Sequence, residues 1–176
     1  MKSVIVGNRI PTGYFTTSGR GESDITVHAG SYHLALCEAG IQAANIITYS
    51  SILPGSARKI SQSSYQITHG EVMETIMAVA HTIQGQTATA GIIFGWLKDK
   101  SGTRFGGLVC EYNGGINEID VKSHLMDMLN ELHQNGYEHY SLSDVEYHVQ
   151  TVTPKKKFGT ALVAICFTSY EVHLDV

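Results

Sequence analysis

The sequence predicts an α+β protein in which a largely antiparallel sheet is covered by helices. Three observations favour this class. Apolar residues recur three or four positions apart in two long segments, as in amphipathic helices. Runs rich in β-branched and aromatic residues lie between and after these segments. Two of the runs are joined by a short connection that contains glycine, which indicates a hairpin and therefore antiparallel pairing.

Three helices are expected. The first runs from Ser31 to Ala39 and ends at Gly40, a residue type that commonly terminates helices. The second covers Glu71–Ile83, where the apolar residues follow helical spacing. The third covers Glu118–Asn135, and Asn117 is expected to cap its N-terminus because its side chain can accept free backbone N–H groups.

Five strands are expected from apolar runs of suitable composition. They are Asn45–Tyr49, Ala88–Lys98, Thr103–Tyr112, Asp144–Thr153 and Thr160–Tyr170. The segment Asp99–Gly102 is expected to form the hairpin between the second and the third of them. Two polar segments, Arg20–Asp24 and Lys155–Lys157, are expected to be solvent-exposed connections.

Length and charge limit the classes of function. The chain has 176 residues, and we expect a single domain over residues 1–176 with a sizeable core. Twelve Lys and Arg against sixteen Asp and Glu give a formal net charge of -4, which argues against a nucleic-acid partner. Charged residues make up only 16%, so much of the surface is expected to be uncharged or covered by another subunit.

The sequence contains no export or membrane signal that we recognise. The run Met1–Gly7 lacks the apolar length and the cleavage site of a signal peptide. The longest apolar stretches, near residues 91–97 and 161–167, are far shorter than the roughly 20 residues of a membrane helix. A cytoplasmic protein without a membrane partner is therefore expected.

Cysteines and histidines form no recognisable disulfide or metal pattern. The cysteines are odd in number and widely spaced, which favours buried free thiols in a reducing compartment. They are Cys37, Cys110 and Cys166. The nine histidines include no pair with the close spacing of zinc ligands, so no metal site is expected. The alternative is that the chain is a metalloprotein with histidine ligands, and stoichiometric binding of a transition metal would indicate it.

The segment Asn45–Pro54 gives the strongest functional signal. Its sequence is Asn-Ile-Ile-Thr-Tyr-Ser-Ser-Ile-Leu-Pro, which on its own predicts a strand that stops at a proline. About sixty residues later, residues 107–114 are Gly-Leu-Val-Cys-Glu-Tyr-Asn-Gly. The two segments, and the order of the elements around them, resemble the pyruvoyl-dependent arginine decarboxylases.

This resemblance implies an αββα sandwich that is made as a self-cleaving precursor. Family members cut themselves between two serines, here Ser50 and Ser51, so a β chain 1–50 and an α chain 51–176 are expected. The Ser51 hydroxyl would attack the Ser50 carbonyl carbon, and the resulting ester would become a covalent pyruvoyl cofactor at residue 51. Family members assemble as trimers of αβ protomers, with the active site between neighbours.

The resemblance also implies the reaction, which converts L-arginine to agmatine and CO₂. The substrate amine forms a Schiff base with the pyruvoyl group, and loss of CO₂ leaves a carbanion that needs a proton. Glu111 matches the family's proton donor, and its apolar neighbours are expected to raise its pKa. Asn45 matches an asparagine beside the cleavage site that stabilises the oxyanion formed during processing.

Substrate choice is expected to depend on Tyr32, His33, Ile52 and Asp24. His33 lies twelve positions before the motif's asparagine, where family members carry an aspartate that receives the guanidinium. A histidine accepts one hydrogen bond at most, and it repels a cation when protonated. Either Asp24 or Glu22 replaces that aspartate, or the substrate is a neutral or acidic amino acid. A further alternative is that the chain is a homologue that does not cleave itself and serves as a binding or scaffold trimer.

Overall fold

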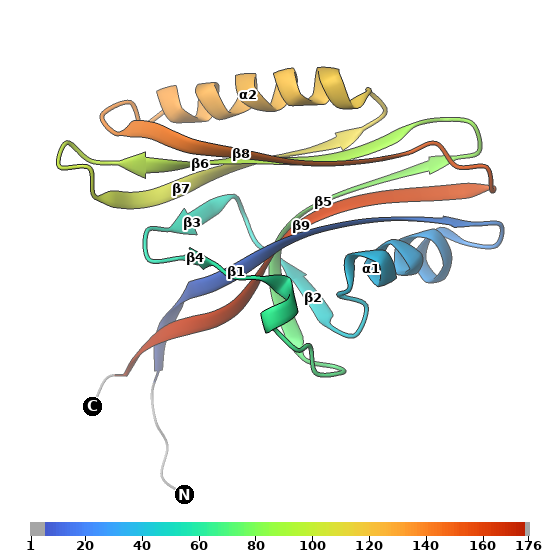
Figure 1. Ribbon diagram of the computed structural model, residues 1–176, viewed down its shortest axis with the longest axis horizontal. Coiled ribbons are helices and arrows are strands. Elements are labelled where there is room, and N and C mark those ends of the chain that lie inside the picture. The colour runs from blue at the N-terminus through green and yellow to red at the C-terminus, as the bar shows by residue number, and fades with distance from the viewer. Residues whose placement is uncertain (1–5, 175–176) are drawn as a thin grey trace, which may run out of the picture.

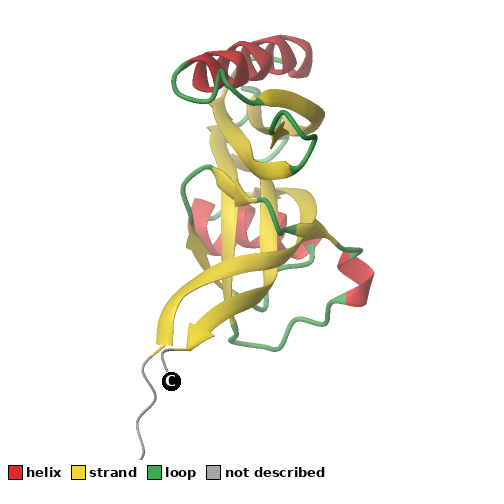
Figure 2. Cartoon of the chain, turned by 90° about the vertical axis from the view of Figure 1, so that its left-hand side faces the viewer, coloured by secondary structure: helices red, strands yellow, loops and turns green. Residues whose placement is uncertain are grey.

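The computed structural model describes residues 6–174, which form four layers in the order helix, sheet, sheet, helix (Figure 1). This arrangement confirms the expected αββα sandwich. The same layers are seen from the side in Figure 2, with one helical layer at the top and the other lower down. The run Met1–Gly7, in which the sequence predicts no export signal, lies mostly outside the described residues.

The first sheet has five strands in the order β2-β5-β9-β1-β4. The strands are β1 (Val6–Ser23), β2 (Asn45–Thr48), β4 (Arg58–Lys59), β5 (Val72–Ile83) and β9 (Phe158–Leu174). Strand β9 pairs antiparallel with β1 and β5, whereas β2 and β4 pair parallel to their neighbours. A π-helical turn (Val27–Tyr32) continues into α1 (His33–Ala39), which ends at Gly40 as expected and packs on β1.

The second sheet is fully antiparallel, in the order β3-β7-β6-β8. Its strands are β3 (Ile52–Pro54), β6 (Ala88–Lys98), β7 (Arg104–Gly114) and β8 (Ser141–Val152), and a short 3₁₀ helix (Gln62–Ser64) follows β4. Helix α2 (Glu118–Gln134) covers its outer face. The Asn117 side chain accepts the N–H groups of Ile119 and Asp120, which confirms the expected cap. The five expected strands and the Asp99–Gly102 hairpin are also present.

Apolar side chains fill all three spaces between the layers. The central space, between the sheets, includes Ile76, Ile92, Phe94, Val163 and Ile165. The space under α1 includes Phe15, Ala35, Met73 and Leu162. The space under α2 includes Ile93, Leu108, Leu125 and Leu129.

The expected helix over Glu71–Ile83 is wrong, because this segment forms strand β5. The first sheet is covered on both faces. Ile76 and Ala78 pack between the sheets, whereas Met73 and Met77 pack on the side of α1. A strand buried on both faces has apolar residues without alternation, and such a run can match helical spacing by coincidence.

The sequence does not predict β1, and the exposed turn expected at Arg20–Asp24 is wrong for residues 20–23, which end this strand. The glycines in this segment are more typical of loops, so the sequence does not indicate a strand. A Cβ at Gly19 would lie 2.1 Å from the Ala35 carbonyl oxygen, and one at Gly21 would lie 2.2 Å from that of Ser31. These glycines therefore permit close contact between β1 and the helical layer.

The cysteines are free, but they are not all buried. Cys110 and Cys166 are buried as expected, whereas Cys37 is exposed, so the expectation is wrong for that residue. Helix α1 buries Ala35 and Ala39 against the sheet, and Cys37 lies between them on the other face. Burial raises the pKa of Cys110 to about 11 and that of Cys166 to about 12.

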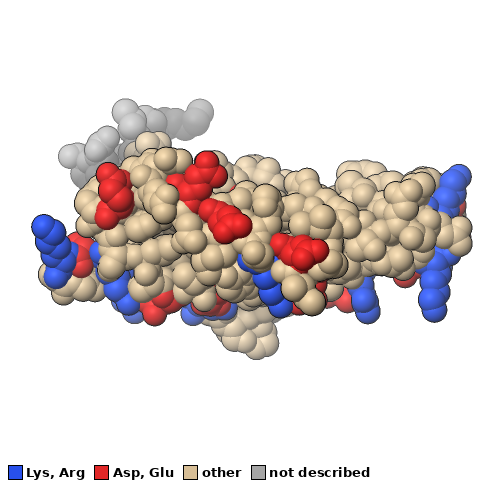
Figure 3. All heavy atoms as spheres, turned by 90° about the horizontal axis from the view of Figure 1, so that it is seen from above, with Lys and Arg blue, Asp and Glu red and all other residues tan. Residues whose placement is uncertain are grey.

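Charged groups are sparse on the surface. Figure 3, which looks down on the α2 layer, shows wide uncharged areas between separate acidic and basic groups. Lys155–Lys157 are exposed in the connection between β8 and β9, as expected. Of the helices between residues 6 and 174, none has the length and apolarity to cross a membrane.

Candidate active site

Ser50 and Ser51 lie where the chain crosses from the first sheet to the second. Immediately before them, the Tyr49 N–H donates to the Thr75 carbonyl oxygen at 2.6 Å, which holds the chain on β5. Immediately after them, Ile52 begins β3 and pairs with β7. The peptide bond between the two serines is therefore anchored on both sides, while Ser50 itself is exposed.

The backbone turns tightly at Ser51. The Ile52 N–H donates to the Ser50 carbonyl oxygen at 3.0 Å, which closes a three-residue turn. The Val109 N–H donates to the Ser51 carbonyl oxygen, also at 3.0 Å. The first hydrogen bond withdraws electron density from the Ser50 carbonyl carbon, and it can stabilise negative charge on that oxygen.

The Ser51 hydroxyl donates to the Glu111 carboxylate, with distances of 2.9 Å to Oε1 and 2.8 Å to Oε2. Glu111 lies on β7 and is half-buried. Burial raises the pKa of Glu111 above its usual value of 4.5, and the hydrogen bond from Ser51 opposes this only in part. The pair thus combines a hydroxyl nucleophile with a carboxyl group that can accept and later return a proton.

A cavity of about 390 Å³ opens beside this pair and is large enough for a small molecule. One wall comes from the crossing and from β7, and the other comes from the C-terminal end of α2 and the residue after it. The lining residues are Ser51, Val109, Cys110, Glu111, Met128, Glu131, Leu132 and Asn135. We call this space the serine cavity.

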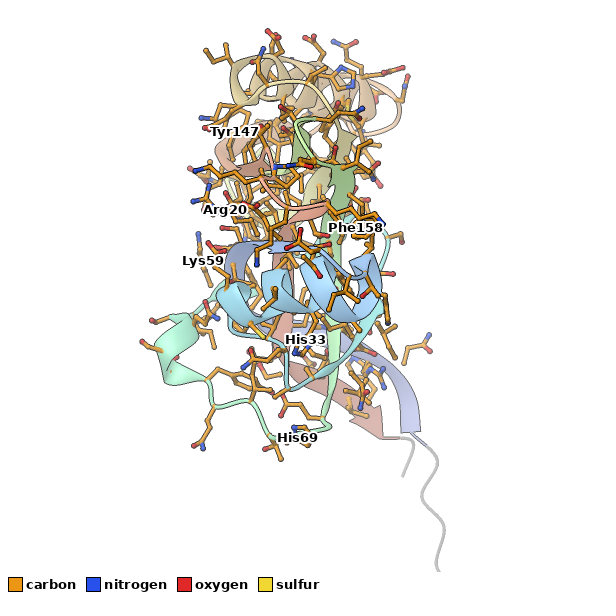
Figure 4. The ribbon with its side chains drawn as sticks, turned by 90° about the vertical axis from the view of Figure 1, so that its right-hand side faces the viewer. Arg20, His33, Lys59, His69, Tyr147 and Phe158 are labelled. Carbon is orange, nitrogen blue, oxygen red and sulfur yellow. The ribbon has the colours of Figure 1, made fainter. Side chains whose placement is uncertain are left out.

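A second cavity of about 610 Å³ contains three of the predicted site residues, Tyr32, His33 and Asn45. We call it the histidine cavity. It is lined by α1 and the start of β2, and Figure 4 shows His33 at the α1 layer, well below α2. The Asn45 side chain donates to the Gly70 carbonyl oxygen at 2.8 Å. In the described chain the two cavities share no lining residue, so these three residues and Ser51 are not brought together.

Two histidine rings pack against Tyr32, which lines the histidine cavity. The His28 ring stacks on Tyr32 at 5.7 Å, and the His81 ring meets it edge-on at 5.9 Å. Burial raises the pKa of Tyr32. The pKa of His81 is lowered, mainly by burial and to a smaller extent by the charge of the nearby His28. Residues 6–174 contain no group of three or more His, Cys, Asp or Glu side chains arranged to hold a metal ion.

Asp24, Glu22 and Ile52 lie outside both sets of lining residues. Asp24 Oδ1 accepts the Lys157 N–H at 3.1 Å, and Glu22 Oε2 accepts the Lys155 N–H at 2.7 Å. Both carboxylates therefore fasten β1 and the bend after it to the β8–β9 connection. Ile52 is half-exposed beside Ser51, and its backbone amide forms the tight turn.

Sequence reasoning missed Glu131, whose side chain reaches the serine cavity from α2. The helical pattern marks the buried face of α2 and says nothing of the opposite face. An acidic residue on an exposed helix face is common, so no sequence signal distinguishes Glu131 from Asp127 or Glu118. The packing of α2 beside β7 is what brings it to the cavity.

Comparisons with known proteins identify a family. The family profile described as "Pyruvoyl-dependent arginine decarboxylase (PvlArgDC)" matches residues 13–172. The "Pyruvoyl-dependent arginine decarboxylase AaxB" of Chlamydia abortus is 33% identical over 184 residues, and that of Chlamydia muridarum is 34% identical; each alignment covers 94% of both chains. Among solved structures, a pyruvoyl-dependent histidine decarboxylase at pH 8 is 14% identical with a TM-score of 0.45, covering 58% of this chain and 53% of that one.

Proposed function

Because the chain belongs to the pyruvoyl-dependent arginine decarboxylase family, we propose that it cuts itself between Ser50 and Ser51 and then converts L-arginine to agmatine and CO₂. It is thus a carboxy-lyase with a covalent pyruvoyl cofactor. One domain, 1–176, would yield a β chain 1–50 and an α chain 51–176. The observation that carries the proposal is the Ser51 hydroxyl, held at 2.8 Å by a half-buried carboxylate beside the polarised Ser50 carbonyl.

Self-cleavage follows from the contacts of Ser51. Glu111 accepts the hydroxyl proton as Oγ attacks the Ser50 carbonyl carbon, and the Ile52 N–H stabilises the negative charge on the carbonyl oxygen. The Oγ–C bond forms and the C–N bond breaks, with the proton passing to the Ser51 nitrogen. The product is an ester. Elimination of the Ser50 carboxylate then leaves dehydroalanine at position 51, which water converts to pyruvoyl with release of ammonia.

The surroundings of Ser51 fit a pyruvoyl group. The Val109 N–H, 3.0 Å from the Ser51 carbonyl oxygen, would hold the same oxygen as the amide oxygen of the cofactor. When bound to substrate, the pyruvoyl group draws electrons from the bond to the departing carboxylate. The adjoining serine cavity offers about 390 Å³ for the substrate.

Glu111 is placed to hold the proton that the substrate carbon needs after CO₂ leaves. Burial shifts the pKa of Glu111 upward, so its carboxyl group keeps a proton closer to neutral pH than an exposed glutamate does. Val109, two residues before it on β7, is fully buried in the core between the sheets, so Glu111 has an apolar neighbour. The same carboxyl group would serve both stages, first taking a proton from oxygen and later giving one to carbon.

We also propose a trimer of αβ protomers in which the histidine cavity of one subunit faces the serine cavity of its neighbour. Two observations support this assembly: the cavities share no lining residue within one chain, and apolar side chains are exposed near β2. Ile47 is 49% exposed and Val72 is 61% exposed. The free cysteines agree with a reducing compartment, and we propose the cytoplasm.

A mixed-subunit experiment tests the shared site. Asn45→Ala disables the histidine cavity, and Glu111→Gln disables the serine cavity. If the site spans two subunits, coexpression of the two variants restores part of the activity, because some interfaces combine two unmodified halves. If each chain holds a complete site, the mixture is as inactive as either variant alone.

The proposed function as a whole is tested by the mass of the purified protein under denaturing conditions. Two chains, 1–50 and 51–176, are expected, the second carrying a ketone that borohydride reduces. Release of CO₂ from L-arginine, with agmatine as the product, completes the test. A single intact chain after prolonged incubation would contradict self-cleavage and would favour the binding or scaffold function.

A further inference from the structure

The proposed reaction leaves one requirement unmet, which is a partner for the cationic end of arginine. His33 cannot accept two parallel hydrogen bonds from a guanidinium group. The described residues that line the histidine cavity include no Asp or Glu. Asp24 and Glu22 accept backbone N–H groups of the β8–β9 connection instead. A carboxylate for the guanidinium must therefore come from another part of the site.

The serine cavity contains such a carboxylate at Glu131. It is the second acidic residue among the lining residues, and no Lys or Arg is among them. Glu111 is already assigned to proton transfer, whereas the Glu131 side chain makes no hydrogen bond or ion pair with any residue in the described range 6–174. Glu131 is exposed on α2, so its carboxylate is available to a ligand.

The charge around Glu131 favours a cation. After Lys122, helix α2 carries the acidic residues Asp127 and Glu131 and has no Lys or Arg. Glu131 also lies in the last turn of α2, where the free carbonyl groups carry partial negative charge. The basic residue of this turn, His133, is hydrogen-bonded through Nε2 to the Tyr140 carbonyl oxygen, so no Lys or Arg in the last turn of α2 offsets the charge of Glu131.

The other lining residues fit the aliphatic part of the same substrate. Met128 and Leu132, both partly buried, flank Glu131 on α2. A ligand with a short hydrocarbon stem and a cationic end can contact these apolar groups and keep its charge at Glu131. A carboxylate accepts two parallel hydrogen bonds from a guanidinium group, and Asn135 adds a further polar side chain at the same end.

We propose that Glu131 binds the cationic end of the substrate side chain and selects arginine over neutral amino acids of the same shape. This inference rests on the proposed function, because it assumes that the serine cavity is where decarboxylation takes place. It assigns a specificity residue to α2, in place of the carboxylate that is missing at His33. The chemical step itself stays with Ser51 and Glu111.

The test compares Glu131→Gln with Asp127→Asn, a matched control. Asp127 is exposed on α2 one turn earlier and is not among the lining residues of the serine cavity. Each variant is offered L-arginine and L-citrulline, which have the same length but differ in charge. Glu131→Gln is expected to lower kcat/KM for arginine about tenfold, chiefly through KM, because a charge-assisted hydrogen bond is lost at a partly solvated site. Its kcat/KM for citrulline and its self-cleavage should match those of the control.

A binding measurement keeps this inference separate from the proposed function. The Ser51→Ala chain stays uncut, and calorimetry can measure its affinity for agmatine with and without Glu131→Gln. A loss of about tenfold with Glu131→Gln, and none with Asp127→Asn, supports the assignment even if the chain releases no CO₂. Equal agmatine affinity, or an unchanged preference for arginine over citrulline, overturns it while self-cleavage and arginine decarboxylation still stand.

Discussion

Within residues 6–174, two serine–carboxylate pairs involve connections between strands, and the pairs differ in their surroundings. At the crossing from β2 to β3, Ser51 Oγ donates to Glu111 at 2.8 Å. In the hairpin between β6 and β7, Ser101 Oγ donates to Asp99 at 2.6 Å. The chemical groups are the same and the distances are similar, so hydrogen-bond geometry alone does not separate a reactive pair from a structural one.

The carboxylates of the two pairs differ in burial and in their other partners. Asp99 Oδ1 also accepts the N–H groups of Ser101 and Thr103, and these local hydrogen bonds, led by that of the Ser101 hydroxyl, lower its pKa. Glu111 comes from a different strand than Ser51, and burial raises its pKa. The hairpin pair therefore stabilises its own turn as an anion, whereas the crossing pair can exchange a proton. Burial of the carboxyl group therefore distinguishes the two pairs.

The largest difference is expected between the variants that lack the hydroxyl group of Ser51 and of Ser101. Ser51→Ala has no nucleophile, so the chain is expected to stay as one piece of 176 residues and to release no CO₂. Ser101→Ala is expected to cut fully into chains 1–50 and 51–176. Denaturing mass spectrometry of both variants gives the answer directly. Cleavage of Ser51→Ala between residues 50 and 51 would show that the Ser51 hydroxyl is not the nucleophile.

Replacement of the two carboxylates should give the next largest difference. Glu111→Gln removes a proton acceptor and a proton donor, so both self-cleavage and decarboxylation are expected to slow by about 10²- to 10⁴-fold. Asp99→Asn should leave both rates within the error of the wild type. Pulse-labelled cell-free synthesis followed by gel electrophoresis measures cleavage, and CO₂ release measures turnover. Similar losses in the two variants would mean that the carboxylates act only through stability.

Features whose signals lie within a few neighbouring residues are predictable from the sequence. The motif around Ser50 and Ser51 can be recognised because the proposed self-cleavage needs specific residues in a fixed order. The helical cap at Asn117 and the Asp99–Gly102 hairpin are predictable because their signals lie within a few residues. Each of these features depends on local chemistry.

The features that sequence analysis missed depend on packing. Strand β5 has helical spacing of apolar residues because both of its faces are covered, and no local signal reveals two covered faces. Strand β1 has the glycines of a loop because α1 packs closely on it. In the same way, Glu131 becomes a site residue only when α2 lies beside β7. The two cavities can likewise be told apart only in three dimensions.

Stability should respond to pH in opposite ways at the two carboxylates. The pKa of Glu111 is raised on folding, so its contribution to stability is present below its usual pKa of 4.5 and is lost as pH rises through the folded value. The pKa of Asp99 is lowered, so its contribution is present above its usual pKa of 3.8 and is lost as pH falls. Urea unfolding of the uncut Ser51→Ala chain across acidic and neutral pH measures both.

Single substitutions in that chain assign the pH dependence. Adding Glu111→Gln should make the protein relatively more stable as pH rises, whereas adding Asp99→Asn should make it relatively less stable. Because Ser51→Ala also removes the hydrogen bond that lowers the pKa of Glu111, the effect of Glu111 should be larger in this background than in the uncut wild type. The same direction of change for both variants would contradict the assigned shifts.

The smallest expected effect concerns the backbone of the hairpin. Gly102 has a φ of +83°, and a Cβ there would have no atom within 4 Å, so Gly102→Ala tests backbone conformation without a clash. The left-handed conformation is expected to cost about 1 kcal/mol of unfolding free energy, measured by urea unfolding of the Ser51→Ala chain. Cleavage of the otherwise unmodified chain should proceed at the normal rate, because the Asp99–Gly102 turn holds none of the groups that react. Slower cleavage in Gly102→Ala would show that the hairpin is coupled to the crossing through β7, and the two connections could no longer be treated as independent.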